Sequence, residues 1–200
     1  MTMSPISLAF KNCKKEKRPA LITFTVAGDN SKKNSLKILN SIARYADILE
    51  LSFLHNCPIA DGGQIQNSTY RSLENGTTLK DTFQIAKKFK NINPNKPLIL
   101  MGYYNLIYQN GENNFLKNCK LSKVDGLIVV DLPWPENKKF AEKCNYNFLT
   151  GSLSFGSLKA YIRSMIGYKT NVRTETRNAY MRSIMRTVED TVKGLDGFDA

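Results

Sequence analysis

Apolar and polar residues alternate in blocks along the first three quarters of the chain, and the apolar blocks predict buried strands. Four of them cover residues 20–26, 47–52, 97–103 and 124–131. Each block is nearly continuous in apolar residues, which is typical of parallel strands covered on both faces. Residues 146–150 are a shorter candidate for a fifth strand.

Between the strands, apolar residues recur at spacings of three and four, which predicts helices. The predicted helices cover residues 35–45, 68–75, 79–89, 115–122 and 137–143, with Ser35 as a candidate cap of the first. Residues 11–18 are basic and are expected to be a solvated helix end or a loop. Strands that alternate with helices indicate an α/β fold with a parallel sheet.

The pattern changes after Gly151, where no further continuous apolar strand is found. Helices are predicted over residues 157–165 and 173–193, and the second has apolar residues on one face. Arginines Arg173, Arg177, Arg182 and Arg186 make this helix a candidate interaction surface. An ordinary amphipathic helix that covers the edge of the sheet explains it equally well. The expected organisation is therefore a barrel-like domain over residues 1–150 and a basic helical extension over residues 151–200.

Composition narrows the possible classes of protein. The 200 residues carry a net charge of +12, which favours acidic partners, although a bias toward Lys and Asn explains the charge equally well. No recognised nucleic-acid module is present, and no apolar run approaches the ~18 residues of a membrane span. The four cysteines lack CxxC spacing and there is one histidine, so we expect no metal site and reduced thiols in a reducing intracellular compartment.

Two acidic residues lie at positions that form the active site in barrel enzymes. Glu50 lies near the end of the second predicted strand, and Asp61 lies in the proline-acid-glycine turn that follows it. In (β/α)8 barrels, active sites are built from strand ends and the loops after them, so these acids are candidates for acid/base catalysis. His55 and Cys57 stand in the same loop but lack a third activating group, so no Cys/His nucleophile is expected.

Several ordered motifs resemble the tryptophan synthase alpha subunit family. Residues 21–29 (LITFTVAGD) are similar to its opening strand, and residues 47–51 (DILEL) with 58–62 (PIADG) are similar to its active-site signature. Residues 101–105 (MGYYN) and 124–133 (VDGLIVVDLP) match in the same order, so the resemblance covers about residues 6–150.

The resemblance implies a TIM-type (β/α)8 barrel that cleaves indole-3-glycerol phosphate to indole and glyceraldehyde 3-phosphate without metal or organic cofactor. By that resemblance, Glu50 protonates the indole ring carbon and Asp61 accepts a hydrogen bond from the ring nitrogen. Phe24, Tyr103 and Asp131 line the substrate pocket or the subunit contact.

The chain departs from the family pattern in two places. The family has a glycine and then a proline-phenylalanine-serine-aspartate run, whereas here Ser52, Leu54 and Cys57 replace the glycine, the proline and the aspartate. After about residue 150, the last three strands and their phosphate site are not recognised. A complete barrel takes about 250 residues, so we expect a partial barrel of four to five parallel strands followed by C-terminal helices.

Three functional hypotheses follow. The first is a relative that has lost efficient lyase activity and serves as a structural or interaction subunit of a larger, acidic assembly. The alternative is an active alpha subunit, a carbon–carbon lyase of tryptophan biosynthesis that works with a tryptophan synthase beta subunit. A third is a fusion or reading-frame change after about residue 150. The expected location is the cytoplasm or, from the Lys/Asn-rich composition, a plastid stroma.

Overall fold

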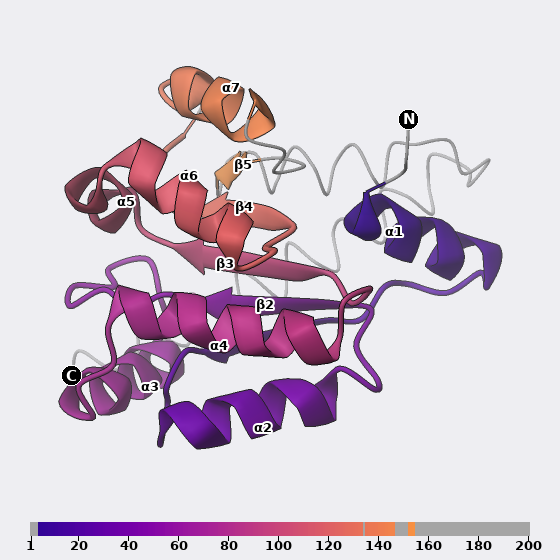
Figure 1. The fold of residues 1–200 in the computed structure, drawn as a ribbon, viewed down its shortest axis with the longest axis horizontal. Coiled ribbons are helices and arrows are strands. Elements are labelled where there is room, and N and C mark those ends of the chain that lie inside the picture. Colours follow the sequence, from indigo (N-terminus) through magenta and orange to yellow (C-terminus); the bar gives the residue numbers. More distant parts are fainter. Residues whose placement is uncertain (1–3, 134, 147–151, 155–200) are drawn as a thin grey trace, which may run out of the picture. The chain divides into compact units, whose positions relative to one another are not determined.

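The computed structural model describes residues 4–133, 135–146 and 152–154. The chain divides into two units, Met1–Leu158 and Lys159–Ala200, and the described residues all belong to the first. Its strands form one parallel sheet in chain order (Figure 1): β1 (Ile22–Val26), β2 (Ile48–Ser52), β3 (Leu98–Gly102), β4 (Gly126–Val129) and β5 (Ser152–Ser154). The expected partial TIM-type α/β fold is confirmed.

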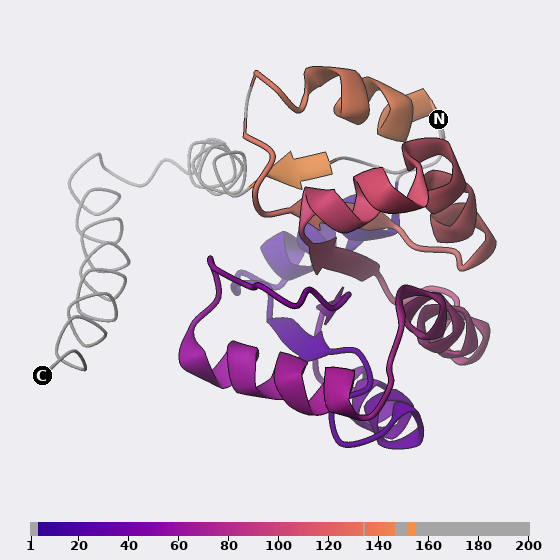
Figure 2. The ribbon, with the colours of Figure 1, turned by 90° about the vertical axis from the view of Figure 1, so that its left-hand side faces the viewer.

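Helices precede the sheet and connect its strands. Their bounds are α1 (Pro5–Lys15), α2 (Lys32–Ile42), α3 (Gly63–Glu74), α4 (Leu79–Ile92), α5 (Tyr104–Asn110), α6 (Glu112–Leu121) and α7 (Lys138–Tyr146). Helices α2, α4 and α6 lie along one face of the sheet, as Figures 1 and 2 show from two directions. This succession of strand, helix and parallel strand is the repeating unit of a (β/α) barrel.

The sheet is apolar on both faces, which explains the continuous apolar runs of the sequence. On the helix-covered face, Leu49, Leu51, Leu98 and Leu100 are fully buried in one core with Phe89 of α4 and other helix residues. On the opposite face, Ile48, Ile99 and Ile128 form a second cluster. Residues alternate between the two faces along each strand, so one strand contributes to both cores.

Helix α1 covers the second cluster at the amino-terminal ends of the strands. Ile6, Ala9 and Phe10 pack against that cluster, and Ile6 approaches Gly126 so closely that an added Cβ would lie 3.1 Å from its Cδ1. The helix starts at a favourable sequence: Ser4 accepts a hydrogen bond from the backbone N–H of Ser7, and Pro5 occupies the first turn. The amino-terminal end of the sheet is thereby closed.

Two polar contacts fix the strands at that same end. The guanidinium of Arg18 donates to both carboxylate oxygens of Asp47 (2.7 and 2.8 Å), and the backbone N–H of Leu21 donates to Asp47 as well (2.7 Å). The buried ammonium of Lys90 donates to Asp125 (2.8 Å). These contacts anchor the beginnings of the strands and leave their carboxyl-terminal ends for the site.

The structure confirms one expectation about element type and corrects another. Residues 11–18 include the expected solvated helix end, because α1 extends to Lys15 and its last turns are exposed apart from buried Cys13. Of the fifth strand expected over residues 146–150, only Tyr146 is among the described residues, and it is helical. Tyr146 ends α7, which presents buried Phe140 and Cys144 four residues apart, and the fifth strand is β5, after Gly151.

Helix starts also differ from the expected ones. Helix α2 begins at Lys32 because Ser31 is its cap, accepting from Asn34 N–H, while Ser35 is buried inside the helix. Helix α3 begins at Gly63, five residues before the expected start, and α5 was not predicted at all. The expected helices over residues 157–165 and 173–193 lie outside the described residues.

Candidate functional site

Strand register places Glu50 on the face of the sheet that carries the second cluster, whose amino-terminal end α1 covers. Glu50 pairs with Phe24 of β1 on one side and with Ile99 of β3 on the other. Side chains two residues apart share a face of the sheet, so Glu50 follows Ile48 of the second cluster toward the carboxyl-terminal end of β2. Phe24 and Glu50, both expected in the site, are therefore neighbours.

The Glu50 carboxyl group is half-buried and isolated. Among the described residues this carboxyl group accepts no hydrogen bond and forms no ion pair, while the Thr25 hydroxyl donates to the backbone carbonyl of Glu50 (3.4 Å). Burial alone raises the pKa of the Glu50 carboxyl above its ordinary value. A carboxyl group with a raised pKa keeps its proton closer to neutral pH, as a general acid requires.

Asp61 is joined to the neighbouring strand through Tyr103. The Tyr103 hydroxyl donates to the Asp61 carboxylate (3.1 Å) and accepts from the backbone N–H of Ala60 (2.9 Å). Burial raises the pKa of Asp61, and the hydrogen bond from Tyr103 partly opposes that rise. The pKa of Tyr103 itself is raised to about 12, chiefly by burial, so this hydroxyl remains a proton donor in the hydrogen bond.

The loop between the two acids is held from both sides. The side-chain amide of Gln66, in the first turn of α3, donates to the backbone carbonyl of Asp61 (2.8 Å). His55 packs its ring against Tyr103, with 5.0 Å between the ring centroids. The sequence alone indicated no role for Gln66 or His55. The signal for Gln66 is its spacing after the PIADG motif, which places it in the first turn of the next helix.

Asp131 lies at the end of β4 and accepts from the backbone N–H of Tyr104 (2.6 Å). Tyr104 is the first residue of α5, so this carboxylate satisfies a free N–H at the start of a helix. The contact positions the segment that begins with Tyr103. Asp131 is exposed, and its expected role as a lining residue is not tested by this contact.

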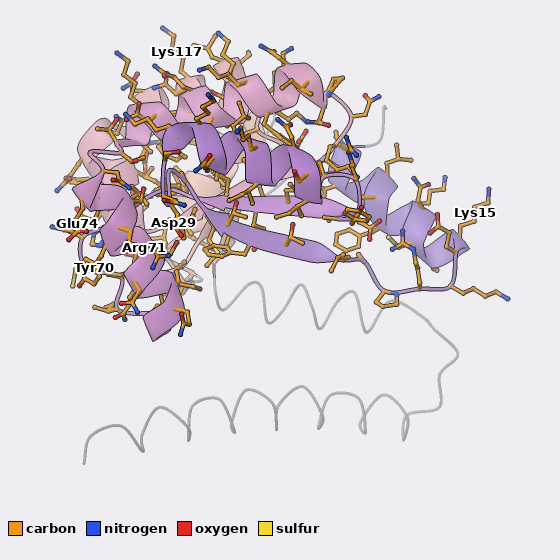
Figure 3. The ribbon with its side chains drawn as sticks, turned by 90° about the horizontal axis from the view of Figure 1, so that it is seen from below. Lys15, Asp29, Tyr70, Arg71, Glu74 and Lys117 are labelled. Carbon is orange, nitrogen blue, oxygen red and sulfur yellow. The ribbon has the colours of Figure 1, made fainter. Side chains whose placement is uncertain are left out.

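A second acid–base contact attaches α3 to β1. Asp29, just after β1, accepts two hydrogen bonds from Arg71 of α3 (2.9 and 2.8 Å) and one from the Ser68 hydroxyl (2.5 Å). Figure 3 shows Asp29 and Arg71 pointing toward one another, with Tyr70 and Glu74 beside them on α3. The Arg71 guanidinium lowers the pKa of Asp29. This contact anchors the helix whose first turn contains Gln66.

Several hollows lie in the described surface. One of about 430 Å³ lies between α1 and the loop containing Pro94, at the amino-terminal ends of the strands. Another, of about 500 Å³, lies beside Tyr104 and Tyr108. Neither of these two is lined by Glu50 or Asp61. A third hollow, of about 260 Å³, is lined by Phe24 of β1 and by residues of α3 such as Gln64 and Ser68.

Four further expectations concern metal sites, membrane helices, the cysteines and the arginines. Within the described ranges, no cluster of three or more His, Cys, Asp or Glu side chains is arranged to hold a metal ion. No helix of the described part is long and apolar enough to cross a membrane. All four cysteines are free thiols. Arg173, Arg177, Arg182 and Arg186, the expected interaction residues, lie outside the described residues.

Comparison with known proteins identifies relatives in sequence. The family model described as "Tryptophan synthase alpha chain" matches residues 10–151. A tryptophan synthase alpha chain from Pelagibacter ubique is 55% identical over 191 residues, covering 96% of this chain and 71% of the relative. That similarity therefore continues into residues 151–200. A tryptophan synthase alpha chain from Pyrococcus furiosus is 45% identical over 62% of this chain and 49% of its own length.

Solved structures agree with the sequence relatives. A crystal structure of a tryptophan synthase complex from Pyrococcus furiosus matches with a TM-score of 0.65 and 41% identity, over 68% of this chain and 55% of that one. A structure from Aquifex aeolicus matches with a TM-score of 0.70 and 30% identity, over 74% and 58%. The chain thus spans about half to three quarters of its relatives. Nothing in these similarities indicates lost activity or a plastid origin.

Proposed function

The chain belongs to the tryptophan synthase alpha chain family, and from that premise we propose that it is a lyase that cleaves indole-3-glycerol phosphate to indole and glyceraldehyde 3-phosphate. The observation that carries this proposal is the isolated, half-buried Glu50 carboxyl at the end of β2, the strand whose following loop brings Asp61 to Tyr103. The strong identity to the Pelagibacter chain favours an active subunit over an inactive structural one.

The reaction breaks the bond between the indole ring carbon and the first carbon of the glycerol chain. In the first step protonated Glu50 gives its proton to the ring carbon, and the ring nitrogen becomes positively charged. In the second step the glycerol hydroxyl on the carbon that leaves loses its proton to the Glu50 carboxylate. The carbonyl forms, the carbon–carbon bond breaks, and its electron pair neutralises the ring. Glu50 ends protonated, as it began.

Asp61 complements the charge that develops during the first step. A carboxylate that accepts a hydrogen bond from the ring N–H stabilises the positive nitrogen more than the neutral one, which lowers the barrier. The Tyr103 hydroxyl orients this carboxylate before the substrate binds, and the Gln66 amide holds the backbone carbonyl of the same residue. Phe24, paired with Glu50 across β1 and β2, offers an aromatic side wall for the indole ring.

We also propose a tryptophan synthase beta subunit as the partner. One structural relative is described as the tryptophan synthase α2β2 complex of a hyperthermophile, Pyrococcus furiosus, and it matches with 41% identity and a TM-score of 0.65. This favours a beta subunit over an unrelated acidic assembly.

The test is release of indole from indole-3-glycerol phosphate by the purified 200-residue chain, alone and with a tryptophan synthase beta subunit. The proposal expects indole and glyceraldehyde 3-phosphate in equal amounts, and faster release with the beta subunit. No release under either condition, from a chain that retains its folded circular dichroism spectrum, contradicts it.

A further inference from the structure

His55, the single histidine of the chain, makes a local hydrogen bond within the loop after β2. Its Nδ1 accepts from the backbone N–H of Cys57 (3.0 Å). An imidazole nitrogen that accepts has no hydrogen, so the neutral ring must have its proton on Nε2. The bond closes a short turn immediately before Pro58, at the start of the segment that leads to Asp61.

The same ring also contacts the group that holds Asp61. It packs on Tyr103 with an angle of 31° between the ring planes. Tyr103 in turn binds the backbone of Ala60 and the carboxylate of Asp61. One side chain therefore connects the beginning of the loop, through its turn with Cys57, to the end of the loop, through Tyr103.

A histidine makes a contact here that a phenylalanine at the same position could not make. Both rings pack on Tyr103, but only imidazole accepts the Cys57 N–H, and only while it is neutral. Protonated imidazole carries hydrogens on both nitrogens and cannot accept. The turn with Cys57 therefore depends on the protonation state of the ring, as a contact between two backbone groups does not.

We propose that His55 is a positioning residue that holds the Asp61 loop in its productive conformation when the imidazole is neutral and releases it when the imidazole is protonated. The inference rests on the proposed lyase function. The titratable groups around the ring are Tyr103, which it contacts, Cys57 in the turn, and Asp61 and Asp131, whose charges act on Tyr103. None of the described carboxylates forms an ion pair with His55, so protonation gains no compensating contact.

Two substitutions separate the parts of this role. In His55→Asn, the side-chain oxygen can accept the Cys57 N–H and does not titrate. In His55→Phe, the ring can still pack on Tyr103 but accepts nothing. The full chain is assayed with a beta subunit. At pH 8, we expect kcat/KM of His55→Phe to fall about tenfold, the scale of one lost hydrogen bond, and that of His55→Asn to stay within about threefold of wild type.

The pH dependence distinguishes positioning from simple folding support. Between pH 8 and pH 5.5, the ratio of wild-type kcat/KM to that of His55→Asn should fall by about threefold or more, because only the wild type loses the turn. A constant ratio, or a His55→Phe variant as active as wild type at pH 8, overturns the proposal. Titration of Glu50 and Asp61 affects both proteins and cancels in the ratio.

Nuclear magnetic resonance of the ¹⁵N-labelled imidazole separates this inference from the lyase proposal. Because the chain has one histidine, its two ring nitrogens are assigned without ambiguity. The expected neutral form has its proton on Nε2, and the Cys57 amide signal should shift with the same midpoint as the ring. A proton on Nδ1 overturns the loop geometry. If the chain shows the expected spectrum but releases no indole, the lyase function is overturned, while the His55–Cys57 turn is still supported.

Discussion

Tyr103, at the end of β3, donates its hydroxyl hydrogen to the carboxylate of Asp61, on the loop after β2, across 3.1 Å. Forty-two residues separate the two along the chain. The contact exists because β2 and β3 are parallel neighbours, so both chain segments leave the sheet at the same end. The hydroxyl also accepts from Ala60 N–H, which fixes the backbone beside the carboxylate.

Replacing Tyr103 with phenylalanine should therefore weaken the site without unfolding the protein. The variant keeps the ring against His55 but removes both hydrogen bonds, and we expect kcat/KM for indole-3-glycerol phosphate to fall by about tenfold, or about 1.4 kcal/mol. Steady-state kinetics with a beta subunit measures it. Unchanged kinetics would contradict the positioning of Asp61 by Tyr103.

The same substitution should move the pH profile. The Tyr103 hydrogen bond lowers the pKa of Asp61 against the effect of burial, so its loss raises that pKa. Asp61 must be ionised to stabilise the charged ring nitrogen, and the acid limb of kcat/KM should therefore shift to higher pH in Tyr103→Phe. A shift to lower pH would assign the acid limb to another group.

Gly102 is required where β3 meets the catalytic loop. An added Cβ would lie 2.4–2.6 Å from three ring atoms of Phe53, a buried residue of the loop after β2. Gly102→Ala must displace that ring, and we expect a loss of about 1–3 kcal/mol in the free energy of unfolding. Urea denaturation measures the loss. The control is Gly62→Ala, where nothing lies within 4 Å of the added Cβ, and a change of similar size there would contradict the explanation.

The Asp47–Arg18 contact should make stability depend on acid pH. The Arg18 guanidinium holds the pKa of the Asp47 carboxyl well below its usual range. Its contribution is complete above the ordinary aspartate pKa of about 4 and is lost as the pH falls below it toward the folded-state value. We expect Asp47→Asn to lower the free energy of unfolding by about 1 kcal/mol at pH 7, with a smaller difference from wild type below pH ~4.

Glu16→Gln is the matched control for that prediction. Glu16 also binds Arg18 (2.6 Å), but both side chains are about half exposed, so the pair is screened by water. We expect a change within about 0.5 kcal/mol. Equal losses in the free energy of unfolding from Asp47→Asn and Glu16→Gln would contradict a specific role of Asp47 in anchoring the strands.

Much of the sheet could be predicted from sequence because its strands are buried on both faces. Runs such as the one that contains Leu98 and Leu100 need no partner to be recognised, and the first four strands begin within two residues of the expected positions. Helix α1 could not be recognised in the same way. Its many lysines hide the short apolar face in the sequence pattern. That face, which includes Ile6 and Phe10, is recognised only from its contacts with strands that follow later in the chain.

Of the candidate site, only the two acidic residues could be predicted from the sequence. Glu50 and Asp61 belong to motifs of adjacent residues, so the sequence shows them directly. The contacts of His55 with Cys57 and Tyr103 depend on the conformation of one loop and on strand neighbours, and no spacing in the sequence encodes them. For the same reason α5 was missed: the carboxylate at its start, Asp131, comes from the end of β4.

The most direct test of the account is the indole release rate of Glu50→Gln, measured with a beta subunit beside wild type. Glutamine keeps the shape of the side chain but cannot transfer the proton, and we expect kcat to fall by about 100-fold or more. Glu74→Gln, on an exposed carboxylate of α3, should match wild type. A Glu50→Gln variant with wild-type kcat would contradict the assignment of Glu50 as the proton donor and acceptor.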